Sequence, residues 1–133
     1  MAEGRSTGAR GPSPKRKAAE QRGRKGETLA AWSLRLKGYR ILAQRVRTPV
    51  GEIDLIAEKS GTIIFVEVKA RAGRLAALNA VTPHAWARIA RAADYWMARR
   101  PHYSDHGWRY DLIAITPARW PEHIRDAWRP GMF

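Results

Sequence analysis

Two short acidic motifs stand inside the most apolar stretch of the chain. Asp54 lies in "GEIDLIA", and Glu67 lies in "FVEVKAR", where Lys69 follows two residues later. Burying an unpaired charge is costly, so these side chains must either neutralise one another or bind a ligand. Two carboxylates, completed by backbone carbonyl and water oxygens, are a donor set that suits Mg²⁺ or Mn²⁺. The residue types therefore suggest a divalent cation site or a self-compensating ionic cluster.

The turn between the two motifs predicts how their side chains meet. Residues 51–58 and 63–70 are expected to be strands, and a two-residue Ser60-Gly61 loop makes them a hairpin. In that register Asp54 faces Glu67, and Glu52 faces Lys69. Directly opposed like charges destabilise a sheet, and a bound cation would remove the repulsion. A slip of one residue would instead turn the acids of one strand to the other face.

The other elements follow from apolar periodicity and capping residues. Residues 27–37 predict a helix with Ala31 and Leu34 on its inner side and Glu27 at the edge of that side. Thr82 and Pro83 predict the start of a second helix, and tryptophans at helical spacing in both helices are expected in the core. Strands are expected over 39–47 and 108–115, and a turn-rich tail with at most one short element after them. The order αβββαβ predicts an α/β domain with helices packed on a sheet.

Charge and composition limit the class of partner. The chain has 25 Lys and Arg against 12 Asp and Glu, a formal net charge of +13, which favours a nucleic acid. Residues 1–25 are basic and lack a large apolar residue after Met1, so we expect a disordered basic tail before a single domain over 26–133. The absence of cysteine excludes disulfides and thiolate sites. No apolar run approaches a membrane span, so we expect a soluble cytoplasmic protein.

The combined motifs resemble a known family. "GEIDLIA" and "FVEVKAR", with "GETLAAWSLRLKGYRIL" before them and "AVTP" and "RYDLIAI" after them, resemble the YraN family of uncharacterised bacterial proteins. This resemblance implies a restriction-endonuclease-like fold, with a mixed central β-sheet flanked by helices, and a likeness to Holliday-junction resolvases. Their nuclease motif is an Asp followed by Glu-x-Lys on adjacent strands, the PD-(D/E)xK type. Such nucleases commonly act as symmetric dimers, so a homodimer is one expected state.

The resemblance implies roles for individual residues. Asp54 and Glu67 would be catalytic metal ligands for Mg²⁺ or Mn²⁺, joined by the Val68 carbonyl and by Glu27 from the first helix. Lys69 would be the catalytic lysine, and Glu52 would support it. Family members usually carry a lysine shortly after the "VTP" segment, whereas this chain has Ala85 there, next to His84.

The expected function is that of a metal-dependent DNA endonuclease, with DNA rather than RNA as its partner and branched or structured DNA among its substrates. Four basic residues are expected to contact the phosphates, namely Arg71, His84, Arg88 and Arg91. Two alternatives remain open at this stage. The fold could serve as a non-catalytic nucleic-acid-binding module, or as a nuclease-like domain recruited to another protein, because fold does not determine activity.

Overall fold

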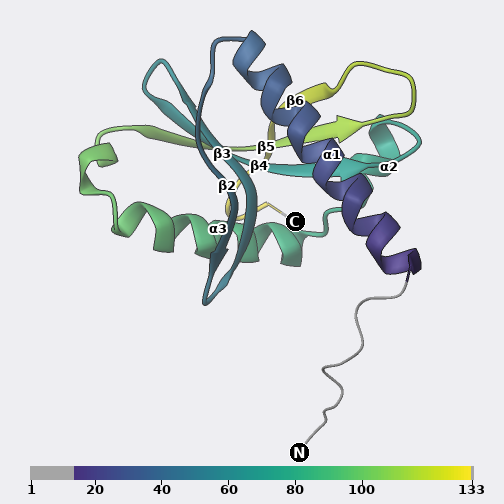
Figure 1. Cartoon of the computed structure of the whole chain (residues 1–133). Coiled ribbons are helices and arrows are strands. Elements are labelled where there is room, and N and C mark those ends of the chain that lie inside the picture. Colours follow the sequence, from purple (N-terminus) through teal and green to yellow (C-terminus); the bar gives the residue numbers. More distant parts are fainter. Residues whose placement is uncertain (1–13, 133) are drawn as a thin grey trace, which may run out of the picture.

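The computed structural model describes residues 14–132 (Figure 1). Within these residues, four helical segments and five strands follow one another. They are α1 (Pro14–Leu36), β2 (Arg40–Thr48), β3 (Gly51–Lys59), β4 (Thr62–Ala70), α2 (Arg74–Asn79), α3 (Pro83–Ala98), the short 3₁₀ helix η1 (Pro101–Tyr103), β5 (Gly107–Ile115) and β6 (Glu122–Trp128).

The five strands form one mixed sheet in the order β2-β3-β4-β5-β6. Strands β4 and β5 are parallel, and the other neighbours are antiparallel. The parallel pair requires a crossover connection, which α2, α3 and η1 supply. This sheet flanked by helices is the expected α/β architecture, and it is compatible with the restriction-endonuclease-like fold.

The sheet has a buried cluster on each face, because its central strands are apolar on both sides. Helix α3 covers one face and α1 covers the other (Figure 1). Phe65 packs on the α3 side among Trp86, Ile89 and Trp96, whereas Leu34 packs on the α1 side. Helix α3 begins as expected: the Thr82 hydroxyl accepts a hydrogen bond from the Ala85 N–H, and Pro83 is the first helical residue.

Helix α1 differs from the expectation at its start and in one tryptophan. It begins at Pro14, whereas we expected a helix from Glu27 and a disordered tail up to residue 25. The segment from Pro14 to Gly26 is rich in Lys, Arg and Ala, which are strong helix formers even without a buried face. Trp32 was expected in the core but is 55% exposed, because Ala30, Ala31 and Leu34 occupy the inner side of the helix. Residues 1–13 of the expected tail lie outside the described residues.

Two elements go beyond the expectation. Helix α2 is a short helix between β4 and α3 that was not predicted, and β6 is the one short element that the turn-rich tail was expected to allow, paired with β5 in the sheet. The sequence of β6, "EHIRDAW", has little alternation of apolar residues, so its pairing with β5 determines its conformation. None of the helices within residues 14–132 combines the length and apolar character required to cross a membrane.

Candidate functional site

The site forms where strands β3 and β4 separate. Their pairing follows the expected register, with Glu58 opposite Ile63 and Ile56 opposite Phe65, and it ends at Leu55 and Val66. Asp54 and Glu67 are the next residues on each strand. Here a side-chain hydrogen bond replaces the backbone hydrogen bonds between the two strands: Asp54 Oδ2 accepts from the Val68 N–H at 2.8 Å.

A local irregularity at Asp54 produces this opening. Ile53 and Ile56 both pack on the α3 side, whereas Leu55 packs on the α1 side, so the alternation of faces breaks at Asp54. On the neighbouring strand, Arg45 adopts a positive φ of 52°, a conformation that is rare for a residue with a side chain. The regular strand alternation that the expected pairing of Glu52 and Asp54 assumed is therefore interrupted at Asp54, one of the candidate metal ligands.

The two carboxyl groups influence each other strongly. Burial and then the adjacent Asp54 carboxylate raise the pKa of Glu67 from 4.5 to about 8. The metal-free pair consequently retains a proton near neutral pH. A divalent cation bound between the two carboxylates would offset the same repulsion.

Lys69 contacts Glu67 and not the residue expected opposite it. Its Nζ lies 3.4 Å from Glu67 Oε2, and both side chains are largely buried. The expected ion pair between Glu52 and Lys69 is not formed between these two described residues, because the strands have separated before reaching them. Glu52 is exposed and lines two cavities, one shared with Asp54 and one shared with Glu67.

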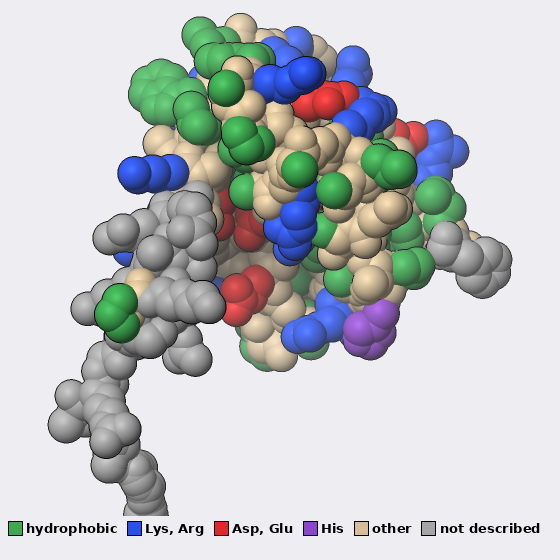
Figure 2. Space-filling model, turned by 90° about the vertical axis from the view of Figure 1, so that its right-hand side faces the viewer, with side chains coloured by type: hydrophobic (Ala, Val, Ile, Leu, Met, Phe, Trp, Pro, Cys, Tyr) green, Lys and Arg blue, Asp and Glu red, His purple; other side chains and the backbone are tan. Residues whose placement is uncertain are grey.

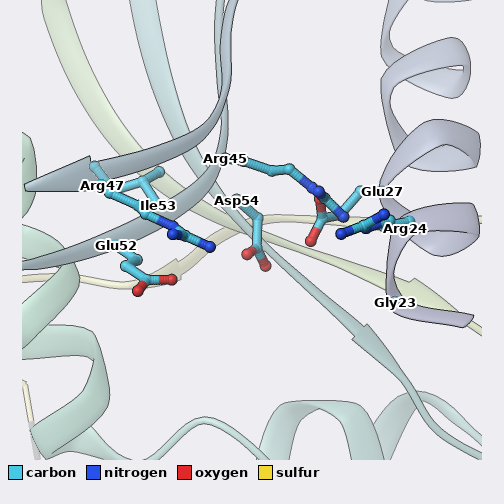
Figure 3. Close-up of a pocket in the computed structure, with 8 residues that line it drawn as sticks. All are labelled: Gly23, Arg24, Glu27, Arg45, Arg47, Glu52, Ile53 and Asp54. Carbon is cyan, nitrogen blue, oxygen red and sulfur yellow. The ribbon is translucent and has the colours of Figure 1, made fainter. Parts of the chain in front are cut away.

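Glu27 approaches the site from α1 but is already paired. Its Oε1 accepts a hydrogen bond from Arg45 Nε at 2.8 Å. Glu27 and Asp54 line the same cavity of about 370 Å³ (Figure 3), together with Arg24, Arg45 and Arg47. Figure 2 shows acidic side chains in a hollow beside basic ones. The sequence interpretation did not assign these three arginines to the site, because they come from two separate elements and follow no motif.

Asp54, Glu67 and Val68 could hold a divalent cation. Within residues 14–132, no group of three or more His, Cys, Asp or Glu residues converges as a metal site, so the protein offers two carboxylates, not three. Because the N–H and C=O of an extended residue point to the same strand edge, the Val68 carbonyl also faces the opening near Asp54. Hard oxygen donors with space for water fit Mg²⁺, which usually keeps several waters and uses one or two carboxylates.

The four expected phosphate contacts are distributed over different surfaces. His84 and Arg88 lie with Glu52 and Glu67 around a cavity of about 330 Å³. Gly51 permits this approach of β3 to α3: its φ is +156°, and a Cβ there would lie 3.0 Å from the Arg88 carbonyl oxygen. Arg91 is exposed on α3 outside this cavity. Arg71 lines a different, mainly apolar cavity beside α1.

Fold and site together define an α/β protein with a mixed sheet and an Asp, Glu-x-Lys constellation at the opening of a hairpin. Residues 26–115 match the family described as "Uncharacterised protein family UPF0102". The chain belongs to this family, also called YraN, as its motifs indicated.

Relatives from several bacteria carry the same family description. A UPF0102 protein from Chelativorans sp. is 51% identical over 111 residues, which cover 84% of this chain and 90% of the relative. One from Parvibaculum lavamentivorans is 48% identical and covers 85% of each chain. One from Mesorhizobium japonicum is 48% identical and covers 87% of this chain and 93% of its own length.

Arg47 provides a test of the cavity as a phosphate-binding surface. If this cavity contacts the phosphates of DNA, Arg47→Gln should weaken DNA binding in EDTA about equally for all sequences and lower the slope of log Kd against log salt by about one. Arg40→Gln is a matched control, since Arg40 lies on the same strand but pairs with Glu58 at its other end. Equal salt slopes for both variants would place the bound DNA elsewhere.

Proposed function

We propose that this protein is a metal-dependent endonuclease that hydrolyses phosphodiester bonds in DNA. The proposal depends mainly on three side chains where β3 and β4 separate. The Asp54 and Glu67 carboxyl groups interact, and Lys69 Nζ lies 3.4 Å from Glu67 Oε2. Three arginines border the same hollow, which suits a polyanionic substrate. The restriction-endonuclease-like architecture supports the same reaction class by analogy.

The proposed chemistry divides among few residues. Asp54, Glu67 and the Val68 carbonyl would hold Mg²⁺ or Mn²⁺, and such an ion supplies Lewis-acid polarisation of a phosphate oxygen. Lys69 would hold the attacking water and stabilise the negative charge that develops on the phosphoryl group. The water loses a proton as its oxygen forms a bond to phosphorus, the bond to the departing sugar oxygen breaks, and that oxygen takes up a proton, so that one proton passes from water to the leaving group overall. Arg45 and Arg47 would position the sugar-phosphate backbone of the DNA substrate.

A binding role without cleavage is the second candidate, and one observation favours it. Glu27, the acid expected to complete the metal site, is engaged by Arg45. If that ion pair persists with substrate, Glu27 would add no ligand to the two carboxylates, whereas the basic surface would still bind nucleic acid. Cleavage assays distinguish the two candidates.

The decisive experiment is a substrate panel with purified protein. Branched, flapped, linear and single-stranded DNA, and duplex RNA, are incubated in Mg²⁺, Mn²⁺ or EDTA. We expect DNA cleavage that EDTA abolishes and that falls by at least about 100-fold in Asp54→Asn, because a ligand and its charge are lost. Asp105→Asn removes a carboxylate that is 89% exposed and serves as the matched control. Tight binding without cleavage in either metal would favour the binding module.

A further inference from the structure

A second polar cavity lies at the other end of the sheet. It measures about 470 Å³, and residues from the α1–β2 connection, the β3–β4 hairpin, β5 and β6 line it. Thr62 borders this cavity and is the first residue of β4, whereas Glu67 lies five positions further along the strand. At about 3.3 Å per residue, the two sites are roughly 17 Å apart.

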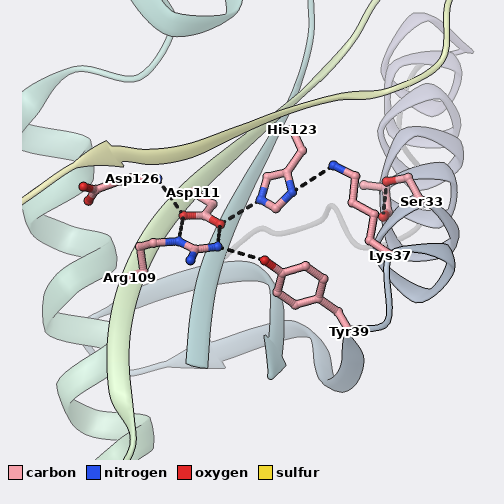
Figure 4. A network of polar contacts seen from close by, with 8 residues as sticks. Ser33, Lys37, Tyr39, Arg109, Asp111, His123 and Asp126 are labelled. Atoms are coloured by element: carbon pink, nitrogen blue, oxygen red, sulfur yellow. Dashed lines mark hydrogen bonds and ion pairs between the residues drawn. The ribbon is translucent and has the colours of Figure 1, made fainter. Parts of the chain in front are cut away.

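A buried carboxylate contacts two of the residues that line this cavity, Arg109 and His123 (Figure 4). Asp111 is fully buried and accepts four hydrogen bonds, from Arg109 Nε, Arg109 Nη2, His123 Nε2 and the Asp126 N–H. Burial alone would raise the pKa of Asp111, but the bonds from Arg109 and His123 outweigh it and lower the pKa to about 2. Both oxygens are saturated, so Asp111 has no lone pair left for another cation.

The lysines of the cavity are bonded only to neutral partners. His123 Nε2 faces the Asp111 carboxylate at 2.7 Å and donates to it, so Nδ1 accepts from Lys37 Nζ at 3.2 Å. Lys59 Nζ donates to the Lys37 carbonyl oxygen at 2.6 Å and lies 5.3 Å from the centre of the Tyr39 ring. Each ammonium group retains further donors.

Positive charge in the cavity is therefore in excess. Arg125 also lines it. Burial and then Arg125 lower the pKa of Lys37, Asp111 opposes this, and Lys59 adds to the lowering, so the net change is downward. Within the described side chains, no carboxylate forms an ion pair with Lys37, Lys59 or Arg125. Mutual repulsion among fixed cations is relieved most by an anion that carries several charges and several acceptor oxygens.

We propose that this cavity binds a phosphate group, free or as part of a nucleotide or nucleic acid. Lys37, Lys59 and Arg125 supply the charge. The Tyr39 hydroxyl accepts from Arg109, so its proton is available to the ligand. The volume exceeds that of one phosphate, which leaves space for an attached sugar. A phosphate is favoured over an acidic peptide by the high density of donors and the net charge of +13. The site is independent of the carboxylate pair and of cleavage.

The test uses the full chain in EDTA, which excludes the metal-dependent site. Binding is measured by titration calorimetry and by amide chemical shifts with inorganic phosphate, against sodium chloride of equal ionic strength. We expect phosphate-specific shifts around Lys37 and His123. Arg125→Gln should weaken phosphate binding by at least about fivefold. The Arg125 side chain is exposed, so this variant should fold. Lys37→Met is a second variant in which phosphate binding is measured. Arg119→Gln, an exposed arginine outside the cavity, is the matched control.

A second arm identifies the source of the phosphate. A short oligonucleotide with a 5′-phosphate is compared with the same oligonucleotide without it. Tighter binding of the phosphorylated form, lost in Arg125→Gln, assigns the cavity to a nucleic-acid end, whereas binding of inorganic phosphate alone assigns it to a small anion. No difference from sodium chloride, no effect of Arg125→Gln, or stronger binding of polyglutamate than of phosphate would overturn the proposal. Loss of DNA cleavage would not affect any of these readings.

Discussion

Lys69→Met is expected to reduce single-turnover DNA cleavage by about 10²–10⁴-fold while leaving DNA affinity within about twofold. A group that positions the attacking water and stabilises developing charge contributes in this range. Binding should be nearly unchanged, because only one of 25 Lys and Arg residues is lost and both carboxylates remain. Single-turnover kinetics at saturating protein measure the chemical step, and a filter-binding assay in Ca²⁺ or EDTA measures affinity.

The contact between Lys69 and Glu67 adds a second readout. Lys69 lowers the pKa of Glu67 and so opposes the effect of burial and of Asp54. Its removal should therefore shift the remaining metal-dependent activity to higher pH. Lys25→Met, which removes an exposed lysine on α1, is the matched control and should show neither effect. A stable Lys69→Met protein that cuts at the normal rate would refute the catalytic role and leave the binding module as the better explanation.

The elements that local sequence determines were predicted well. The Ser60-Gly61 turn fixes the register of the β3–β4 hairpin, and the Leu55–Val66 pairing confirms it up to the candidate site. Thr82 and Pro83 determine the start of α3, and Trp86 and Trp96 face the core as their spacing indicated. In each case, residues that are close in sequence determine the conformation.

The features that distant contacts determine were not predicted. No local signal marks Arg45 for a positive φ, yet this irregularity accompanies the turn of Asp54 into the opening between the strands. Strand β6 likewise depends on β5, and the Asp126 N–H bonds to Asp111 on that strand. The alternation of apolar residues could not reveal the irregularity at Asp54 or the strand β6. In both places, side-chain hydrogen bonds replace part of the regular backbone pairing.

The same distinction applies to the candidate site. The acidic pair could be identified from motif and register, since its members lie on one hairpin. Arg24 and Arg47 come from α1 and β2, and only the packing of α1 across the sheet brings them to one hollow. For that reason the expected set of Arg71, His84, Arg88 and Arg91 covered only part of the basic surface near the carboxylates.

Glu67→Gln is expected to stabilise the metal-free protein at pH 9 by about 2 to 4 kcal/mol and to change its stability little at pH 5. The folded protein holds a proton with a pKa of about 8, whereas the unfolded chain releases it near 4.5. Between these values the folded state binds more protons than the unfolded state. The free energy of unfolding of the wild-type protein should therefore fall as pH rises through this window, and Gln, which stays neutral, removes that dependence.

Denaturant unfolding from pH 5 to 9 in EDTA measures this difference, and Glu52→Gln is the control, because it removes an exposed acid beside the same hollow. Addition of Mn²⁺ or Mg²⁺ should restore stability to the wild-type protein at pH 8 to 9 and have less effect at pH 6, where the cation must displace the proton. Glu67→Gln should lose this response. Wild-type stability that increases from pH 6 to 9 without metal would contradict the raised pKa of Glu67, and with it the repulsion that a cation at Asp54 and Glu67 would relieve.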